Sequence, residues 1–186
     1  MASLSEAQRI GQLFMVGLRK DRVDQALRNA VTTSHFGSVA FTTQTAVGVN
    51  GVRAIADDVQ GLVTDESTRG IGFLVAANQE GGRIQGLSGP GFDTIPSALV
   101  QGRWTPAKLE TNAATWGSQL LNAGINVDLA PVADVVPPGT DAKNAPIGKL
   151  KRAYGHDPAT VASHVGAFIA GMQKAGVATS AKHFPG

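Results

Sequence analysis

Residues Ala123-Gly124-Ile125-Asn126-Val127-Asp128-Leu129-Ala130 predict a helix that ends at a glycine and runs directly into a buried strand. Glycine commonly follows the last turn of a helix because it adopts the left-handed backbone conformation without strain. The same junction recurs as Ala175-Gly176-Val177, and we expect the next strand over residues 177–183. The two helices that end at these junctions begin with a capping side chain followed by proline, at Thr105-Pro106 and Asp157-Pro158. The second half of the chain is therefore predicted to alternate helix and strand.

The first half of the chain shows the same alternation. Short apolar runs predict strands over residues 38–41 and 72–77, and apolar residues at helical spacing predict a helix over residues 51–63 between them. Ser5 is a suitable N-cap for an opening helix, which we extend to Gly17 because apolar residues recur at helical spacing up to that point. Four strands with helices between them predict an α/β fold with parallel strands and right-handed crossovers.

The composition fits one globular domain and argues against several classes of protein. With 186 residues, 42% of them hydrophobic, the chain can bury its own core, and we expect one domain over residues 1–186. The 16 basic and 14 acidic residues form no basic stripe of the kind that binds nucleic acid. The chain has no cysteine, which excludes disulfides, thiolate metal ligands and cysteine nucleophiles. It has no apolar run near the ~20 residues of a membrane span and no signal-peptide pattern, so we expect a cytoplasmic location and no membrane partner.

Polar residues that follow the predicted strands are the candidates for chemistry. Lys182 and His183 end the last strand, just before Phe184-Pro185-Gly186, and polar residues at that end of a barrel strand usually face the ligand. In a regular strand their side chains point to opposite faces, so we expect a bulge or turn to bring both to one site. Arg152 follows a long loop over residues 133–148 and suits fork-like contacts with hydroxyls or carboxylates. Taken alone, Arg152 is better explained as a surface charge.

Other polar residues are predicted to be structural. Gly81-Gly82 indicates a sharp turn or a close approach to a ligand, and we expect Glu80 and Arg83 to pair across that loop. For Asp128 and Asp134 we favour structural hydrogen bonds over ligand contact, because a carboxylate in an apolar run needs partners.

The remaining histidines are not predicted to bind a metal. His35, His156 and His164 form no cluster with metal-ligand spacing, and we interpret them as surface or capping residues. The glycines of residues 48–51 do not form a phosphate-binding motif. We therefore expect no metal site.

Taken in order, four motifs resemble those of glycoside hydrolase family 3, and especially its N-acetyl-β-glucosaminidase branch, which recycles bacterial cell-wall sugars. The motifs are Phe14-Met15-Val16-Gly17, Asn78-Gln79-Glu80-Gly81-Gly82-Arg83-Ile84, residues 124–135, and Lys182-His183-Phe184-Pro185-Gly186. The resemblance covers essentially the whole chain. Residues 144–148 and Arg152 favour the glucosaminidase branch over a β-glucosidase or another exo-glycosidase of the family.

The resemblance implies a TIM-type (β/α) barrel, of which this chain holds about the first four βα units, with a sugar site at the carboxyl ends of the strands. It also implies that Arg152, Lys182 and His183 hydrogen-bond the hydroxyls of the sugar at the cleavage point. The family usually has aspartate where this chain has Asn78, which is expected to bind the same sugar. An amide has one acceptor oxygen and adds a donor, so we expect weaker binding and a changed sugar preference.

The resemblance further implies a retaining hydrolysis that needs no cofactor. The family's aspartate nucleophile, and the histidine and aspartate that act as acid/base in this branch, are expected beyond Gly186. We therefore assign no catalytic residue to this chain, and we do not promote Asp128 or Asp134 to that role.

Two classes of function remain open. One is the N-terminal part of a hydrolase that releases terminal β-linked N-acetylglucosamine from muropeptides or chitin-type substrates. The other is a non-catalytic, sugar-binding half barrel. A full barrel typically needs about 250 residues, so we also expect a truncated barrel that self-associates through its exposed strand edges.

Overall fold

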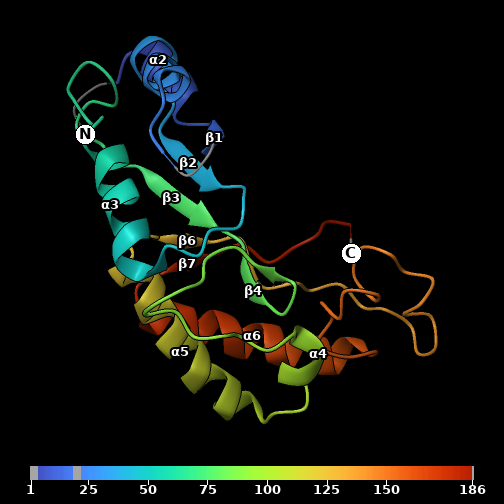
Figure 1. Ribbon diagram of the computed structural model, residues 1–186. Helices are drawn as coiled ribbons and strands as arrows, with labels where there is room; N and C mark the ends of the chain where they lie inside the picture. The colour runs from blue at the N-terminus through green and yellow to red at the C-terminus, as the bar shows by residue number, and fades with distance from the viewer. Residues whose placement is uncertain (1–3, 19–21, 186) are drawn as a thin grey trace.

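The computed structural model describes residues 4–18 and 22–185, which contain six helices and seven strands (Figure 1). The helices are α1 (Glu6–Gly11), α2 (Gln25–Ser34), α3 (Gly48–Gln60), α4 (Ala98–Gln101), α5 (Pro106–Asn122) and α6 (Pro158–Lys174). The strands are β1 (Met15–Leu18), β2 (Ser38–Phe41), β3 (Leu74–Ala77), β4 (Gln79–Gly81), β5 (Ile84–Gln85), β6 (Val127–Asp128) and β7 (Ala178–Thr179).

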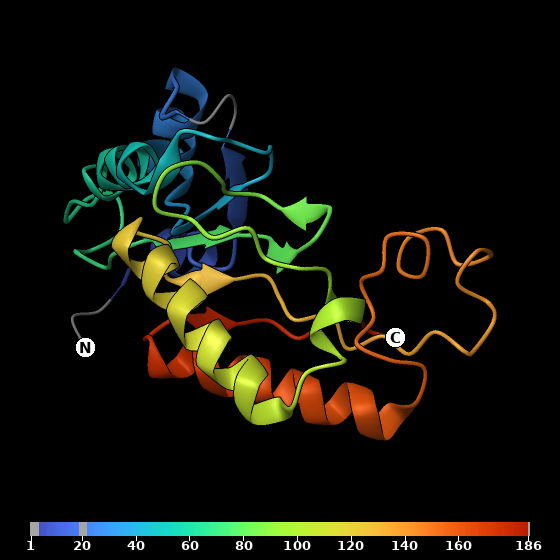
Figure 2. The ribbon, with the colours of Figure 1, turned by 60° about the horizontal axis from the view of Figure 1, so that its bottom comes forward.

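Five of the strands form one parallel sheet in the order β1-β2-β3-β6-β7. The order of these five strands in the sheet is their order along the chain, and all four neighbouring pairs are parallel. The connecting helices α2, α3, α5 and α6 lie on the outer side of this curved sheet (Figures 1 and 2). This stepwise addition of βα units is the progression of a TIM-type barrel, and it confirms the expected α/β fold class. Within the described residues, the sheet begins at β1 and ends at β7, and self-association through these edges stays a prediction.

The sheet has one strand more than the four expected from the sequence. The opening helix was predicted to reach Gly17, but α1 ends at Gly11, and Met15–Leu18 forms β1. Gly11 lies so close to the carbonyl of His35, at the end of α2, that a side chain there would collide with it. Strand β1 pairs in register with β2, from Met15 opposite Ser38 to Leu18 opposite Phe41. The prediction was wrong because these non-local ladder bonds outweigh the local helical spacing.

The last two strands of the sheet are shorter than predicted. Each has two residues, where we expected 125–130 and 177–183. Pro131 follows β6 and has no N–H to donate to a ladder. The two segments meet again further on, where Val132 forms an isolated bridge with Lys182 and the Ala133 N–H donates to the Lys182 carbonyl over 2.6 Å. This second contact holds the chain after β7 close to the chain after β6.

The predicted helix boundaries of α5 and α6 are confirmed by their caps. Thr105 and Asp157 each accept a hydrogen bond from the backbone N–H three residues on. Gly124 and Gly176 have φ angles of +80° and +86°, in the left-handed region that favours glycine. These local devices direct each helix straight into the following strand.

The core lies between the sheet and the outer helices. Helices α5 and α6 pack closely because small residues line their contact: a side chain at Gly171 would collide with the Glu110 carbonyl and lie 2.6 Å from the Ala113 methyl group. Buried side chains from the helices and strands complete the core, including Leu27, Val31, Val39, Val52, Val59, Val75, Leu109, Leu120, Phe168 and Met172. None of the helices that the structure describes combines the length and apolar content needed to cross a lipid bilayer.

Candidate functional site

A cluster of charged and polar side chains lies where the sheet strands end. Asn78 and Glu80 follow β3, Lys182 and His183 follow β7, and Arg152 comes from the loop before α6. The carboxyl ends of parallel strands meet at one edge of the sheet, so residues up to 104 positions apart in the chain come together here. All four predicted sugar-binding residues are in this cluster.

Glu80 is the centre of the cluster, and the sequence analysis assigned it the wrong partner. Its buried carboxylate accepts two hydrogen bonds of 2.8 Å from the Arg152 guanidinium and pairs with the Lys182 ammonium at 2.6 Å. The pKa of Arg152 is raised, chiefly by its hydrogen bond to Glu80. Arg83, the expected partner, is exposed and pairs with no acidic group among the described residues. The sequence did offer a signal for the true partners of Glu80. Lys182 and Arg152 were both predicted to lie at the site, and two buried cations need an acidic partner.

Lys182 links Glu80 to Asn78. Its ammonium group donates to the Asn78 side-chain oxygen over 2.7 Å. The Lys182 side chain is 16% exposed and that of Arg152 is 13% exposed, so both cations are largely withdrawn from water but still reach the surface. Arg152 is therefore fixed in the site by Glu80. It is not the solvated surface charge that its sequence context suggests when taken alone.

His183 forms a second pair, with Asp134. The His183 Nδ1 atom lies 2.7 Å from a carboxylate oxygen of Asp134, and its Nε2 atom lies 3.4 Å from Arg152 Nη2. A carboxylate only accepts, so the proton of a neutral ring belongs on Nδ1, and Nε2 is then free to accept from Arg152 or from a ligand. The regular strand ends at Thr179, so the strand alternation does not apply to Lys182 and His183, and both side chains reach one site.

A buried layer beneath the cluster holds its backbone in place. The Gln79 side chain exchanges two hydrogen bonds with the Leu87 backbone, at 2.9 and 3.0 Å. Gln101 donates to the Glu80 carbonyl over 3.0 Å. The Asp128 carboxylate accepts from the Gln79 N–H over 3.0 Å. These contacts hold Gln79, which lies between Asn78 and Glu80, and the Glu80 carbonyl, and so fix the segment that presents the two side chains.

Asp128 is itself unusual, because its side chain is completely buried. Burial raises the pKa of Asp128 to about 7, although the Gln79 N–H bond and the nearby Lys182 charge act in the opposite direction. One of its two oxygens has no hydrogen-bond partner among the described residues. Both Asp128 and Asp134 bond to protein groups, as expected from the sequence.

Three smaller expectations, for Gly81, His35 and His164, can also be judged. Gly81, with φ +101°, makes the predicted sharp turn, and a side chain there would collide with the Pro96 carbonyl. His35 ends α2 in a left-handed conformation, as a capping residue. His164 was wrongly interpreted, because it is buried and its ring nitrogens lie 2.8 and 3.0 Å from the carbonyls of Thr160 and Trp104.

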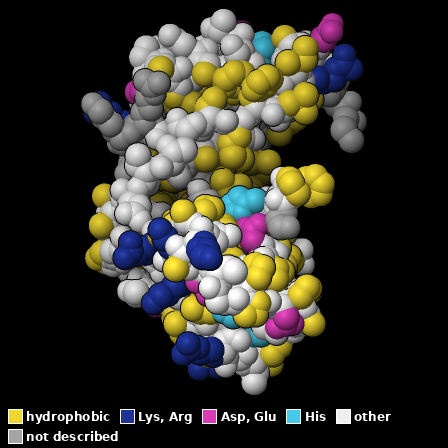
Figure 3. All heavy atoms as spheres, turned by 90° about the vertical axis from the view of Figure 1, so that its right-hand side faces the viewer, with side chains coloured by type: hydrophobic (Ala, Val, Ile, Leu, Met, Phe, Trp, Pro, Cys, Tyr) yellow, Lys and Arg dark blue, Asp and Glu magenta, His cyan; other side chains and the backbone are white. Residues whose placement is uncertain are grey.

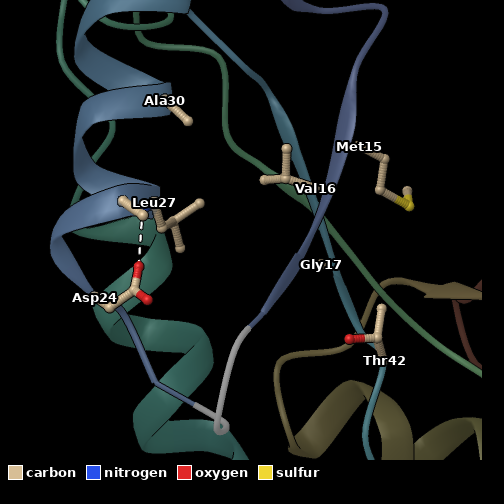
Figure 4. A pocket seen from close by; sticks show the side chains of 8 residues that line it. Met15, Val16, Gly17, Asp24, Leu27, Ala30 and Thr42 are labelled. Carbon is tan, nitrogen blue, oxygen red and sulfur yellow. Dashed lines mark hydrogen bonds between the residues drawn. The ribbon is translucent and has the colours of Figure 1, made fainter.

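Two cavities border residues of the cluster, and a larger cavity lies elsewhere in the molecule. A cavity of about 340 Å³ borders His183 and Asp134 and includes residues of the 133–148 loop, and one of about 180 Å³ borders Asn78. In Figure 3, histidine and acidic side chains lie at the edge of a hollow whose floor is hydrophobic. A third cavity, of about 600 Å³, lies between β1 and α2 (Figure 4). Its carboxylate, Asp24, already caps α2 through the Leu27 N–H, so this cavity offers little chemistry.

Over residues 4–18 and 22–185, no group of three or more histidine or acidic side chains is placed to hold a metal ion. The arrangement at the strand ends instead offers several oriented donors. Such a set suits a ligand with many hydroxyl groups.

Comparison with known proteins agrees with this arrangement. The family model for the glycosyl hydrolase family 3 N-terminal domain matches residues 6–186. The crystal structure of a beta-N-acetylhexosaminidase from Beutenbergia cavernae is 49% identical, with a TM-score of 0.98, and the match covers 100% of this chain and 55% of that one.

More distant relatives point the same way. The beta-hexosaminidase LpqI of Mycobacterium tuberculosis is 36% identical over 189 residues, covering 100% of this chain and 44% of the relative. A family 3 beta-N-acetylglucosaminidase from Paenibacillus is 26% identical, with a TM-score of 0.84, over 99% of this chain and 34% of that one. The chain thus spans about half or less of the length of these relatives. The match of residues 6–186 to the family model shows that the chain belongs to glycosyl hydrolase family 3.

Proposed function

We propose that this chain is the sugar-binding part of a glycoside hydrolase that releases terminal β-linked N-acetylglucosamine with retention of configuration. The observation that carries the proposal is the set of Arg152, Lys182 and His183 held around Glu80 and Asp134 at the strand ends. The names of the Beutenbergia and Mycobacterium relatives support N-acetylhexosamine as the sugar. Muropeptides or chitin-type chains are the proposed substrates, and cell-wall recycling in the cytoplasm is the proposed setting.

In this proposal the cluster binds and orients the sugar. Glu80 fixes both cations, so their remaining N–H groups are aimed before the sugar arrives, and no rearrangement is needed on binding. Lys182 donates to Glu80 and Asn78 and keeps a third proton for a sugar hydroxyl. The Nε2 atom of His183 serves as an acceptor at the rim. Any of these contacts that binds the sugar hydroxyls more tightly in the transition state than in the ground state lowers the barrier to hydrolysis.

The carboxylates of the cluster do not supply the nucleophile in this proposal. Glu80 is held by two cations, Asp134 by His183, and Asp128 is buried beneath Gln79. Each is therefore engaged with the protein, so the nucleophile and the acid/base are proposed to come from residues outside this chain. The alternative of a sugar-binding protein without catalysis shares the same cluster and differs only in turnover.

The test combines binding with turnover. N-acetylglucosamine is titrated into the chain by calorimetry, and release of 4-nitrophenol from 4-nitrophenyl N-acetyl-β-glucosaminide is followed in parallel. Binding without turnover supports the assignment of the cluster and places the reacting groups elsewhere. Arg152→Gln is expected to lower affinity at least tenfold, by about 1.4 kcal/mol or more. The matched change Arg53→Gln, in an exposed pair with Asp57 on α3, is expected to leave affinity unchanged.

Two results would contradict the proposal. The first is no detectable binding of the sugar by a folded chain. The second is equal loss of affinity in Arg152→Gln and Arg53→Gln, because the cluster would then have no special part in binding. Turnover by this chain alone that depends on His183 would leave the sugar site standing but refute the view that the reacting groups lie outside it.

A further inference from the structure

The cavity of about 180 Å³ beside Asn78 has no part in the proposed function. It lies at the carboxyl ends of β2 and β3 and is bounded by the β4–β5 hairpin. Its lining residues are Phe41, Thr42, Thr43, Gln44, Asn78, Arg83, Ile84, Gln85 and Gly86. Asn78 therefore belongs both to this cavity and to the Glu80 cluster. At about 30 Å³ for each water molecule in the liquid, the cavity has room for about six waters, and so for a small substituent on a bound sugar.

Among the described residues, the lining of this cavity carries a positive charge and no negative one. Arg83 is the one charged residue in that part of the lining, and none of the others is acidic. In the described part of the chain, the Arg83 guanidinium forms no ion pair. The nearest acidic residue in the chain, Glu80, has both oxygens occupied by Arg152 and Lys182. Arg83 therefore lines the cavity without a carboxylate partner in the described part of the chain.

Asn78 adds a donor at the boundary between the cavity and the cluster. The ammonium of Lys182 can only donate, so the Asn78 oxygen must face it, and the Asn78 amide nitrogen points elsewhere. That nitrogen has no hydrogen-bond partner among the described residues. An aspartate at this position would place negative charge beside the cavity, whereas the amide offers an N–H donor. Asparagine at position 78 thus makes the cavity more favourable for an anion.

We propose that this cavity binds an anionic ester group, phosphate or sulfate, carried by the sugar that the cluster holds. The guanidinium of Arg83 matches the geometry of such a group, and the amide of Asn78 supplies a further hydrogen bond. Gln44 also lines the cavity, and its amide nitrogen donates to the Arg83 and Gln85 carbonyls over 3.3 and 3.4 Å, which holds the β4–β5 hairpin beside it. The inference rests on the proposed function, because it takes the sugar to be bound beside Asn78.

The test compares neutral and charged forms of one sugar. N-acetylglucosamine, and the same sugar with phosphate at C3, C4 or C6, are titrated by calorimetry at low salt. We expect one phosphate ester to bind about tenfold more tightly than the neutral sugar. Arg83→Gln should remove this preference and leave the affinity for the neutral sugar unchanged, while Arg53→Gln should keep both. Asn78→Asp should also remove the preference, since it places a negative charge beside the cavity. The preference should shrink at high salt, because Arg83 is exposed.

The outcomes separate the two proposals. If the neutral sugar binds but no ester binds more tightly, the anion pocket is refuted and the proposed function stands. If an ester binds tightly and Arg83→Gln keeps the preference, the anion binds elsewhere and the inference is wrong. If neither form binds to the folded chain, both proposals fail. Inorganic phosphate, titrated alone, measures binding of the anion without the sugar. If the chain binds inorganic phosphate as tightly as the sugar phosphate, the site does not recognise a substituted sugar and the inference is refuted.

Discussion

Replacing Asp128 with asparagine is expected to abolish a pH dependence of folding stability that originates directly beneath the sugar site. The Asp128 side chain is fully buried, and its one bonded oxygen accepts from the Gln79 N–H. Burial disfavours the ionised form and raises the pKa of Asp128 from 3.8 to about 7. Asparagine has nearly the same shape as the protonated carboxyl group and carries no charge at any pH. The variant therefore isolates the effect of ionising this one group.

The sign and size of the effect follow from the pKa change. Between about pH 4 and pH 7, folded Asp128 holds its proton while the unfolded chain has already released it. Raising the pH in this range therefore favours unfolding, and the stabilisation present at low pH is lost as the pH passes about 7. At about 1.4 kcal/mol for each pH unit, the rise from 3.8 to about 7 corresponds to a loss of about 4 kcal/mol. That is a large share of the 5–15 kcal/mol typical of a folded domain, which is why the effect should be measurable.

The assay is urea unfolding between pH 4 and pH 8, followed by the fluorescence of the two tryptophans, one of which, Trp116, is buried in the core. The free energy of unfolding of wild type, minus that of Asp128→Asn, should fall by about 4 kcal/mol over this range. Taking this difference removes the contribution that the other titrating groups make to the pH dependence of stability. The matched change Asp57→Asn, at an exposed carboxylate that pairs with Arg53, serves as the control.

Two results would refute this reasoning. If the stabilities of wild type and Asp128→Asn run parallel across the range, Asp128 does not change its ionisation near neutral pH in the folded state. If the difference grows with pH instead of falling, the Lys182 charge and the Gln79 N–H outweigh burial, and the order of these effects is reversed.

Three further predictions concern the same architecture. Glu80→Gln leaves two partly buried cations without a full counter-charge, so it should cost about 3 kcal/mol of stability and weaken N-acetylglucosamine binding; unchanged unfolding and binding curves would contradict the central place of Glu80. Gly171→Ala should cost about 1–3 kcal/mol in urea unfolding, because its methyl group meets α5, whereas Gly166→Ala on the same helix meets nothing within 4 Å and should be neutral or slightly stabilising. Equal effects of the two glycine changes would count against close packing of α5 on α6. His164→Leu should cost about 1–3 kcal/mol, since the Trp104 carbonyl loses its contact with the buried His164 ring, and an unchanged unfolding midpoint would contradict this.

The fold class and much of the helical framework could be predicted because they depend on short-range chemistry. A hydroxyl or carboxylate before a proline begins α5 and α6, and a glycine ends each of them, whatever the rest of the chain does. The order of helices and strands then indicates a parallel sheet whose carboxyl ends share one edge. For that reason Asn78, Arg152, Lys182 and His183 could be assigned to one site from the resemblance and from their place after strands.

Two of the errors concern contacts between distant parts of the chain. Residues 10–17 carry a helical spacing of apolar residues, yet β1 forms from Met15 to Leu18 because β2 lies alongside and pairs with it in register. His164 could not be recognised as buried, because its Trp104 partner lies 60 residues away. No local pattern distinguishes a solvated side chain from one that a remote element covers.

The sequence by itself determined the alternation of helix and strand from β2 onward and the ends of α5 and α6, because these follow from backbone and capping chemistry within a few residues. Only the tertiary structure decided that Glu80 pairs with Arg152, 72 residues away, rather than with Arg83. It also decided that Asp128 lies fully buried and has its pKa raised to about 7. Charge pairing and desolvation depend on distances through space, which are set only when the strands assemble into the sheet.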